Sequence, residues 1–245
     1  MASEKKIALV TGANKGLGLE MARQLGQAGV TVLLAARDPQ KGEAAAAKLR
    51  GEGLDAQFLK LDVIDKRDRA AAVAFVEEKF GRLDILINNA GVSAEPLGGG
   101  TVSTTSEDTI RRTFETNFFA PVALTQALLP LLKNSAAGRI VNMSSILGSQ
   151  TLHADPNSPI YGFKALAYDA SKTALNSFTI HLAYDLKDTR IKVNSAHPGW
   201  VKTDMGTDAA PMEIPDGAKT GVELALLGDD GPTGGFFHLG KPLPW

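Results

Sequence analysis

The sequence contains no cysteine, and this absence excludes several kinds of chemistry. A chain without cysteine has no thiol nucleophile, no cysteine-ligated zinc ion and no disulfide. Its few histidines do not show the close spacing that metal ligands on one helix or strand require. They are His153, His181, His197 and His238. We therefore expect no metal centre.

An excess of one charge is also missing, because 26 Lys and Arg face 27 Asp and Glu, for a net charge of −1. Surfaces that bind nucleic acid or anionic membranes usually carry a clear positive excess, so neither partner is expected. Long hydrophobic runs are absent too. The longest uncharged stretch, Thr116–Leu132, contains an asparagine and two prolines, and we interpret it as a buried helix. Ile7–Val10 is too short for a signal-peptide core, so we expect a cytoplasmic protein.

What the chain does contain is a regular alternation of strand-like and helix-like segments. We predict strands at Ile7–Val10, Val30–Ala36, Ala56–Val63, Leu83–Asn88, Arg139–Met143 and Ile191–Ala196, with a last edge strand within Gly231–Trp245. We predict helices at Leu17–Ala28, Lys41–Arg50, Lys66–Phe80, Glu107–Lys133 and Ala167–Leu186. This order predicts an α/β protein: one Rossmann-type, doubly wound parallel sheet of about seven strands, with helices on both faces.

The length of 245 residues suits one domain over 1–245, and two irregular segments interrupt the pattern. Residues 147–164 and 205–216 each carry two prolines among small and polar residues. Ligands of such sheets bind beyond the carboxyl ends of the strands. We therefore interpret 147–164 as an insertion beside the substrate and 205–216 as a lid over it.

A glycine-rich turn, Thr11–Gly18, joins the first predicted strand to the first predicted helix. Glycines let the backbone turn tightly and approach a phosphate, which the free N–H groups of a helix N-terminus can bind. Taken alone, the same pattern also fits an ordinary strand–helix turn. The predicted cofactor contacts here are Gly12, Asn14, Lys15, Gly16, Leu17 and Gly18.

The end of the second strand indicates which dinucleotide binds. An acid there would accept hydrogen bonds from the ribose of NAD, whereas a cation favours the extra phosphate of NADP. The acid position is taken by Ala36 and is followed by Arg37, and Lys15 could reach the same phosphate. We predict NADP(H). If Asp38 pointed inward in place of Arg37, NAD would also be accepted.

Tyr168 and Lys172 are four residues apart, so a helix places them on one face. The ordinary pKa of tyrosine is near 10, and a neighbouring ammonium is expected to lower it. Tyr168 could then exchange a proton with a carbonyl or alcohol oxygen. A second pair, Tyr161 and Lys164, has a spacing of three and follows a proline, and we reject it.

Four stretches together resemble the classical short-chain dehydrogenase/reductase family: Thr11–Gly18, Asn88–Gly91, Ser144-Ser145 and Tyr168–Lys172. The resemblance implies that Ser145 polarises the substrate carbonyl, Tyr168 is the proton donor and Lys172 assists it. It also implies that Asn117 holds a water that links the lysine to solvent. Further cofactor contacts implied by the resemblance are Asp62, Val63, Asn89, Ala90, Gly91, Tyr168, Lys172, Pro198, Gly199, Val201 and Thr203. Ser145, Tyr168 and Trp200 are the predicted substrate contacts.

Within that family the chain is most similar to NADPH-dependent carbonyl reductases. The stretches that carry this similarity are residues 12–16, 36–38, 116–119 and 198–205. The expected function is reversible hydride transfer from NADPH to a ketone or aldehyde. Two alternatives stay open: reduction of a carrier-bound 3-oxoacyl chain, and a non-catalytic NADP-binding sensor. Ser145 and Tyr168 are further apart than in most classical members, and the insertion between them leaves monomer or homo-oligomer undecided.

Overall fold

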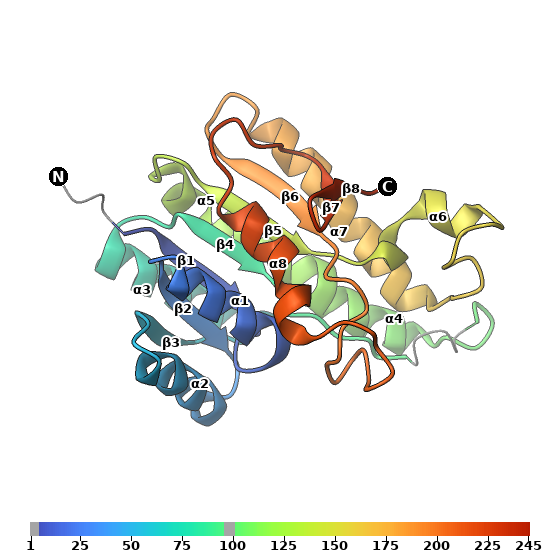
Figure 1. Cartoon of the computed structure of the whole chain (residues 1–245), viewed down its shortest axis with the longest axis horizontal. Coiled ribbons are helices and arrows are strands. Elements are labelled where there is room, and N and C mark those ends of the chain that lie inside the picture. Colours follow the sequence, from blue (N-terminus) through green and yellow to red (C-terminus); the bar gives the residue numbers. More distant parts are fainter. Residues whose placement is uncertain (1–4, 96–100) are drawn as a thin grey trace.

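The computed structural model describes residues 5–95 and 101–245, so residues 1–4 and 96–100 of the predicted domain lie outside it. Its sheet has the strand order β3-β2-β1-β4-β5-β6-β7-β8 (Figure 1). The strands are β1 (Ile7–Thr11), β2 (Thr31–Ala36), β3 (Ala56–Lys60), β4 (Ile85–Asn88), β5 (Arg139–Met143), β6 (Lys192–Ala196), β7 (Phe236–His238) and β8 (Lys241–Pro242). All neighbours pair in parallel except β7 and β8. The predicted doubly wound sheet is confirmed, with a short antiparallel strand beyond the expected seven.

Helices cover both faces of this sheet. They are α1 (Gly16–Gln27), α2 (Pro39–Gly51), α3 (Lys66–Phe80), α4 (Glu107–Phe114), α5 (Ala120–Lys133), α6 (Gln150–Ala154), α7 (Leu166–Asp185) and α8 (Ile214–Ala225). One buried cluster lies between the sheet and α1, α2 and α8, and a second between the sheet and α3, α5 and α7. All of β1 is buried, because its alternate side chains enter the two clusters.

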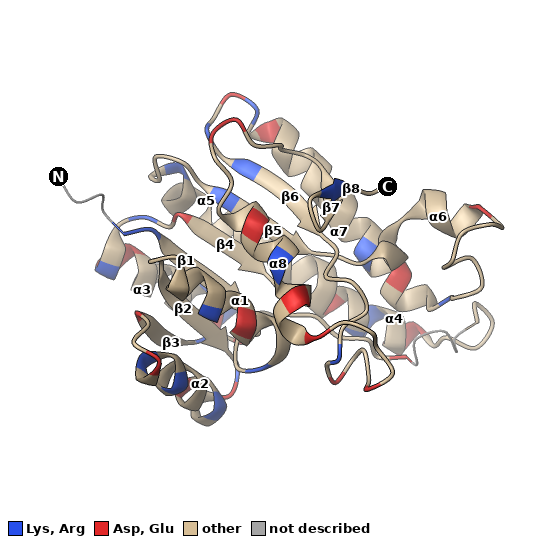
Figure 2. Cartoon of the chain, viewed as in Figure 1, with Lys and Arg blue, Asp and Glu red and all other residues tan. Residues whose placement is uncertain are grey.

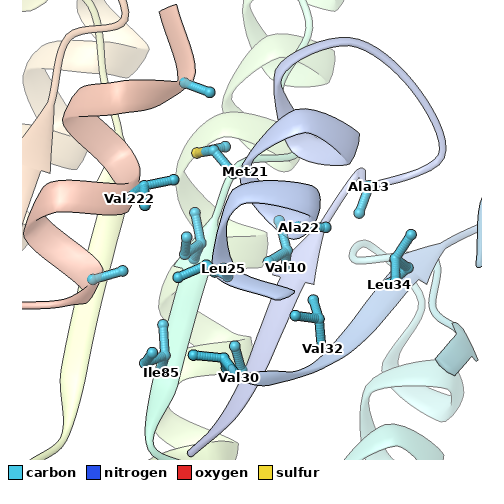
Figure 3. Close-up of a cluster of buried hydrophobic side chains, with 14 of the residues drawn as sticks. Val10, Ala13, Met21, Ala22, Leu25, Val30, Val32, Leu34, Ile85 and Val222 are labelled. Atoms are coloured by element: carbon cyan, nitrogen blue, oxygen red, sulfur yellow. The ribbon is translucent and has the colours of Figure 1, made fainter. Parts of the chain in front are cut away.

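Apolar residues at helical spacing fix α1 on the sheet. Met21 and Leu25 of α1 point toward the strands, and Val222 of α8 lies beside them (Figure 3). Beneath them, Val10 and Ile85 come from the adjacent strands β1 and β4. This packing places the N-terminus of α1 directly after β1, at the edge of the sheet where the glycine turn lies.

The predicted helix Glu107–Lys133 is not one continuous α-helix. A π-helical segment, η1 (Glu115–Phe119), separates α4 from α5. The helix α8 was not predicted, although it begins inside the segment 205–216. The segment 147–164 begins inside a short 3-10 turn, η2 (Ile146–Gly148), which is followed by α6. These two segments are therefore partly helical.

The ends of the parallel strands bring distant segments to one edge of the sheet. The residues that follow β1, β2, β4, β5 and β6 belong to the motifs singled out in the sequence. Both basic and acidic residues occur along the helices and loops drawn in Figure 2. Among residues 5–95 and 101–245, no helix has the length and apolarity that a membrane span requires.

Candidate active site

A cavity of about 840 Å³ opens at the carboxyl edge of the sheet. Its volume lies in the range of small-molecule sites. The predicted cofactor residues in its wall are Gly12, Asn14, Lys15, Gly16, Leu17, Gly18, Arg37, Asp62, Val63, Asn89, Ala90, Gly91, Tyr168, Lys172, Pro198 and Thr203. Gly199 and Val201 are not part of the wall; the backbone of Val201 instead forms a bridge with Met212. The structure thus gathers most of the predicted set around one cavity.

The glycine turn passes very close to the segment that follows β4. Gly12 has φ +64°, in the region that favours glycine, and a Cβ there would lie 3.1 Å from the Cα of Ala90. The Thr11 hydroxyl accepts the backbone N–H groups of Asn89 and Ala90, each at 2.9 Å. Thr11 therefore holds the two turns together at the entrance to α1, where the first N–H groups of a helix can bind an anion.

Replacing Gly18 with alanine should disrupt the close contact between the glycine turn and the segment that follows β4. A Cβ at Gly18 would lie 2.5 Å from both the Gly12 carbonyl oxygen and Asn89 Nδ2, so the turn must shift. We expect a loss of about 1–3 kcal/mol in the free energy of unfolding, the usual result of overpacking, together with weaker dinucleotide binding. Thermal unfolding and a fluorescence titration measure the two effects. Gly51→Ala is the matched control, because a Cβ there meets nothing within 4 Å; equal losses in both variants would contradict the close-approach argument.

The charged residues beside the second strand have different partners. Arg37 is exposed on the cavity wall, and no carboxylate in the described chain pairs with it. Asp38 does not point into the cavity, because it caps α2 by accepting the backbone N–H of Lys41 at 3.1 Å. Lys15 forms an ion pair with Asp204 across the cavity mouth. Arg37 is thus the cation available to a phosphate at the end of β2.

Tyr168 and Lys172 lie in the first part of α7, and both side chains are almost fully buried. Lys172 Nζ donates a hydrogen bond to the Met143 carbonyl at 2.8 Å and lies 5.5 Å from the centre of the Tyr168 ring. The Ser145 hydroxyl accepts the backbone N–H of Leu147 at 3.2 Å and lies near enough to the Tyr168 phenol to influence its pKa. The ends of β5 and α7 therefore bring together a hydroxyl, a phenol and an ammonium.

Burial controls the ionisation of these groups. Removal from water raises the pKa of Tyr168 to about 12, and the opposite effect of the nearby Ser145 hydroxyl is smaller. The same effect lowers the pKa of Lys172 to about 8. The expected lowering of the tyrosine pKa by the ammonium is therefore wrong for this site, where desolvation dominates. At neutral pH the phenol keeps its proton and Lys172 is mostly charged.

Asn117 lies at the centre of the π-helical segment and is 1% exposed. Its Oδ1 accepts the N–H of Val92 at 2.9 Å. Its Nδ2 donates to the Val92 carbonyl at 2.9 Å and to the Ser171 hydroxyl at 3.0 Å. The wider helical turn thus lets Asn117 link the segment after β4 to α7, and Oδ1 keeps one lone pair for a further donor.

Some predicted residues lie away from the cavity, and some of its wall was not predicted. Trp200 is 56% exposed and donates its indole N–H to the Gly206 carbonyl at 2.7 Å. The rejected Tyr161 is exposed and does not line the cavity. Met143 and Ser144 do line it, and the buried Ser144 hydroxyl has no hydrogen-bond partner in the described chain. Their position at the end of a predicted strand was the available signal for both.

Comparisons with known proteins agree with this geometry. The family described as short chain dehydrogenase matches residues 6–214. The chain is 34% identical to (-)-isopiperitenone reductase of Mentha piperita, over 99% of each chain. It is 33% identical to carbonyl reductase [NADPH] 1 of Mus musculus, over the whole of both chains. The structure of an NADPH-bound carbonyl reductase from chicken fatty liver superimposes with a TM-score of 0.86, at 30% identity over 99% of this chain and 100% of that one.

Proposed function

The chain belongs to the short-chain dehydrogenase/reductase family, and on this premise we propose that Ser145, Tyr168 and Lys172 carry out a carbonyl reduction. The protein is an NADP(H)-dependent oxidoreductase that converts a ketone or aldehyde to an alcohol. The observation that carries the assignment of residues is the position of Tyr168 and Lys172 in the wall of a dinucleotide-sized cavity. Ser145 is not part of that wall but lies near the Tyr168 phenol.

The residues around the cavity fit NADP(H). The close approach of Gly12 and Gly18 to the segment after β4 leaves backbone N–H groups at the start of α1 for the pyrophosphate. Arg37, free of any carboxylate in the described chain, is placed to bind the phosphate on the ribose. Asp62 and Val63 form the far wall, where they would flank the adenine. When bound, the cofactor supplies the hydride that reduces the carbonyl carbon.

Ser145 and Tyr168 act on the substrate oxygen. The Ser145 hydroxyl, which lies near the phenol, donates to the carbonyl oxygen and polarises it. Tyr168 then gives its proton to the alkoxide that forms on the substrate. The raised pKa of Tyr168, about 12, suits this direction, because the phenol is protonated at the start.

Lys172 and Asn117 support the proton transfer. As the proton leaves Tyr168, the nearby Lys172 ammonium stabilises the negative charge that develops on the phenol oxygen. Lys172 also contacts the nicotinamide ribose in this proposal. Asn117 holds the segment after β4 against α7. In this proposal the remaining lone pair of its Oδ1 accepts a hydrogen bond from a water molecule, through which a proton returns to Tyr168.

The test is oxidation of NADPH by the purified protein with a panel of aromatic ketones, α-diketones and aldehydes, with NADH in parallel. Turnover of at least one carbonyl is expected. Tight NADPH binding without any turnover would instead favour the sensor. Neither that alternative nor the carrier-bound acyl substrate is favoured, because the intact Ser145, Tyr168 and Lys172 set suits catalysis and the related proteins include carbonyl reductases.

Arg37 is expected to decide the choice between NADPH and NADH. Arg37→Ser removes a charged hydrogen-bond donor from the ribose phosphate, a contact worth about 1.5–3 kcal/mol. We expect kcat/KM for NADPH to fall about 10–100-fold, while kcat/KM for NADH stays unchanged. Steady-state kinetics with both cofactors measure the ratio. Arg111→Ser is the control, since Arg111 pairs with Glu107 on exposed α4; an unchanged ratio in Arg37→Ser would refute the assignment.

Three further expectations belong to this proposal. Residues 1–245 form one catalytic domain, in which 147–164 borders the substrate and 205–216 acts as a lid. The role of 205–216 as a lid is supported by Met205, Thr207 and Asp208, which line the cavity.

The protein acts in the cytoplasm in this proposal. Light scattering of the purified protein distinguishes a monomer from a homo-oligomer.

A further inference from the structure

The helix that carries Tyr168 begins without a capping side chain of its own. The residue at its N-cap position is Ala165, which has no side chain able to accept a hydrogen bond. The first N–H groups of a helix have no partner within the helix and need an acceptor from elsewhere. Here the acceptor is Glu95, whose Oε1 receives the backbone N–H groups of Ala167 at 2.6 Å and Tyr168 at 3.0 Å.

The Glu95 carboxylate is itself held in place. Its Oε2 accepts the Thr105 hydroxyl at 3.0 Å, and its backbone carbonyl accepts the Ser93 hydroxyl at 2.7 Å. Both carboxylate oxygens therefore have partners. Glu95 thus has a defined position relative to the first turn of α7.

The segment 89–95 connects this capping contact to the cavity. It begins with Asn89, Ala90 and Gly91, which line the cavity wall, and it ends at Glu95. In the middle, the backbone of Val92 is bound on both sides by Asn117. One short segment therefore joins the cofactor wall to the backbone N–H of Tyr168.

We propose that Glu95 is a positioning residue for Tyr168, which fixes the first turn of α7 relative to the cofactor wall. The proposal rests on the function of Tyr168 proposed above. Glu95 acts through the backbone N–H of Tyr168 and not through the phenol. A displacement of about 1 Å in a reacting group can lower a rate about 10²-fold, so a contact that sets the backbone position of the proton donor matters for kcat.

The site requires a hydrogen-bond acceptor at the position of the Glu95 carboxylate, and it does not require its negative charge. The buried Asp169 lies in the same helical turn, and its Oδ2 accepts the N–H of Ala165 at 2.9 Å. Burial, together with a smaller effect of the nearby negative charge of Glu95, raises the pKa of Asp169 to about 6. A second negative charge is therefore unfavourable here. A neutral acceptor of the same length should hold the helix equally well.

Three substitutions at Glu95 separate the effect of side-chain length from the effect of its negative charge. Glu95→Ala removes the acceptor, and we expect kcat for carbonyl reduction to fall about 10²-fold with little change in KM for NADPH. Glu95→Gln keeps an oxygen at the same reach and should restore most of kcat. Glu95→Asp keeps the charge but withdraws the carboxylate by one methylene, and should resemble Glu95→Ala. With deuterated NADPH, the isotope effect on kcat should rise in the two impaired variants, because hydride and proton transfer become rate-limiting.

The control is Asp84→Asn at the opposite edge of the sheet. Asp84 is also a carboxylate that links segments, since it accepts the backbone N–H of Ile7 at 2.8 Å and the Ser135 hydroxyl. Asp84→Asn should lower Tm without changing kcat, which separates general destabilisation from misplacement of Tyr168.

The outcomes distinguish the two proposals. Absence of turnover in the wild-type protein would remove the proposed function. Turnover in wild type and Asp84→Asn, with wild-type kcat in Glu95→Ala, would overturn only the role of Glu95. If kcat of Glu95→Gln were as low as that of Glu95→Ala, the argument that a neutral acceptor of the same length is sufficient would be overturned. If Glu95→Ala does not fold by circular dichroism, Glu95→Asp takes its place, and wild-type kcat in that variant would overturn the proposal.

Discussion

Replacing Tyr168 with phenylalanine is expected to lower kcat for carbonyl reduction about 10²–10⁴-fold, the usual contribution of a general acid. The substitution removes only the hydroxyl, so the ring keeps its buried place in α7. The alkoxide formed on the substrate then lacks the proton donor that the proposal assigns to Tyr168. NADPH binding should be almost unchanged. Stopped-flow kinetics of NADPH oxidation measure the rate, and a fluorescence titration measures the binding.

The same helix offers a matched control for this experiment. Tyr184 is 67% exposed near the end of α7, and Lys187 Nζ lies 4.0 Å from the centre of its ring. Tyr184→Phe makes the same chemical change in a tyrosine beside a lysine, far from the cavity. It should leave kcat unchanged. Activity retained in Tyr168→Phe, with NADPH still bound, would transfer the proton-donor role to another group.

Loss of the Lys172 charge is the second change with a large expected effect. Lys172→Met keeps the length of the side chain but removes the ammonium, and we expect kcat to fall about 10²–10³-fold, as when one group that stabilises transition-state charge is removed. The wild-type enzyme should show the same dependence in its pH profile. Since burial lowers the pKa of Lys172 to about 8, the ammonium is present below that pH and is lost above it.

The reduction rate should therefore fall as the pH rises through about 8. Tyr168 does not produce this decline, because its pKa of about 12 keeps the phenol protonated throughout that range. Lys172→Met should lack the decline near pH 8, because it has no ammonium to lose. Lys187→Met is the control and should keep the wild-type profile. A wild-type profile that stays flat through pH 8 would contradict the assigned role of the Lys172 charge.

Elements with local signals could be predicted from the sequence. Helix α3 has the bounds expected, Lys66–Phe80, because Asp65 caps its first turn and Gly81 ends it at φ +66°. The cofactor and catalytic segments were recognised for a similar reason. A glycine turn between strand and helix, and a tyrosine four residues before a lysine, are short patterns that can be found in the sequence without knowledge of distant contacts.

Elements that depend on distant packing could not be predicted in this way. Helix α8 contains Pro215, Gly217 and Gly221, which indicate a loop when read alone. In the structure Pro215 lies in the first turn, where proline is favoured. The two glycines permit close packing, since a Cβ at Gly217 would lie 2.5 Å from Val201 and a Cβ at Gly221 would lie 2.5 Å from Met21. That packing depends on residues far apart in sequence.

The same reason applies within the candidate site. The contact between Glu95 and the first turn of α7 joins residues more than seventy positions apart, so no local pattern indicates it. The pKa of Tyr168 was expected to fall because the sequence shows the neighbouring lysine but not the depth of burial. Burial is a property of the whole fold and here exceeds the effect of the neighbour.

The two outermost strands have a consequence for self-association. An open strand edge can add a strand from another molecule, which leads to aggregation. One outer strand, β8, has only two residues, and one of them is a proline without an N–H to donate. At the other side, Lys60 ends β3 and is paired with Asp68 of α3. Both outer strands thus discourage the addition of a strand from another molecule, which matters for a protein whose net charge is only −1 and gives little mutual repulsion.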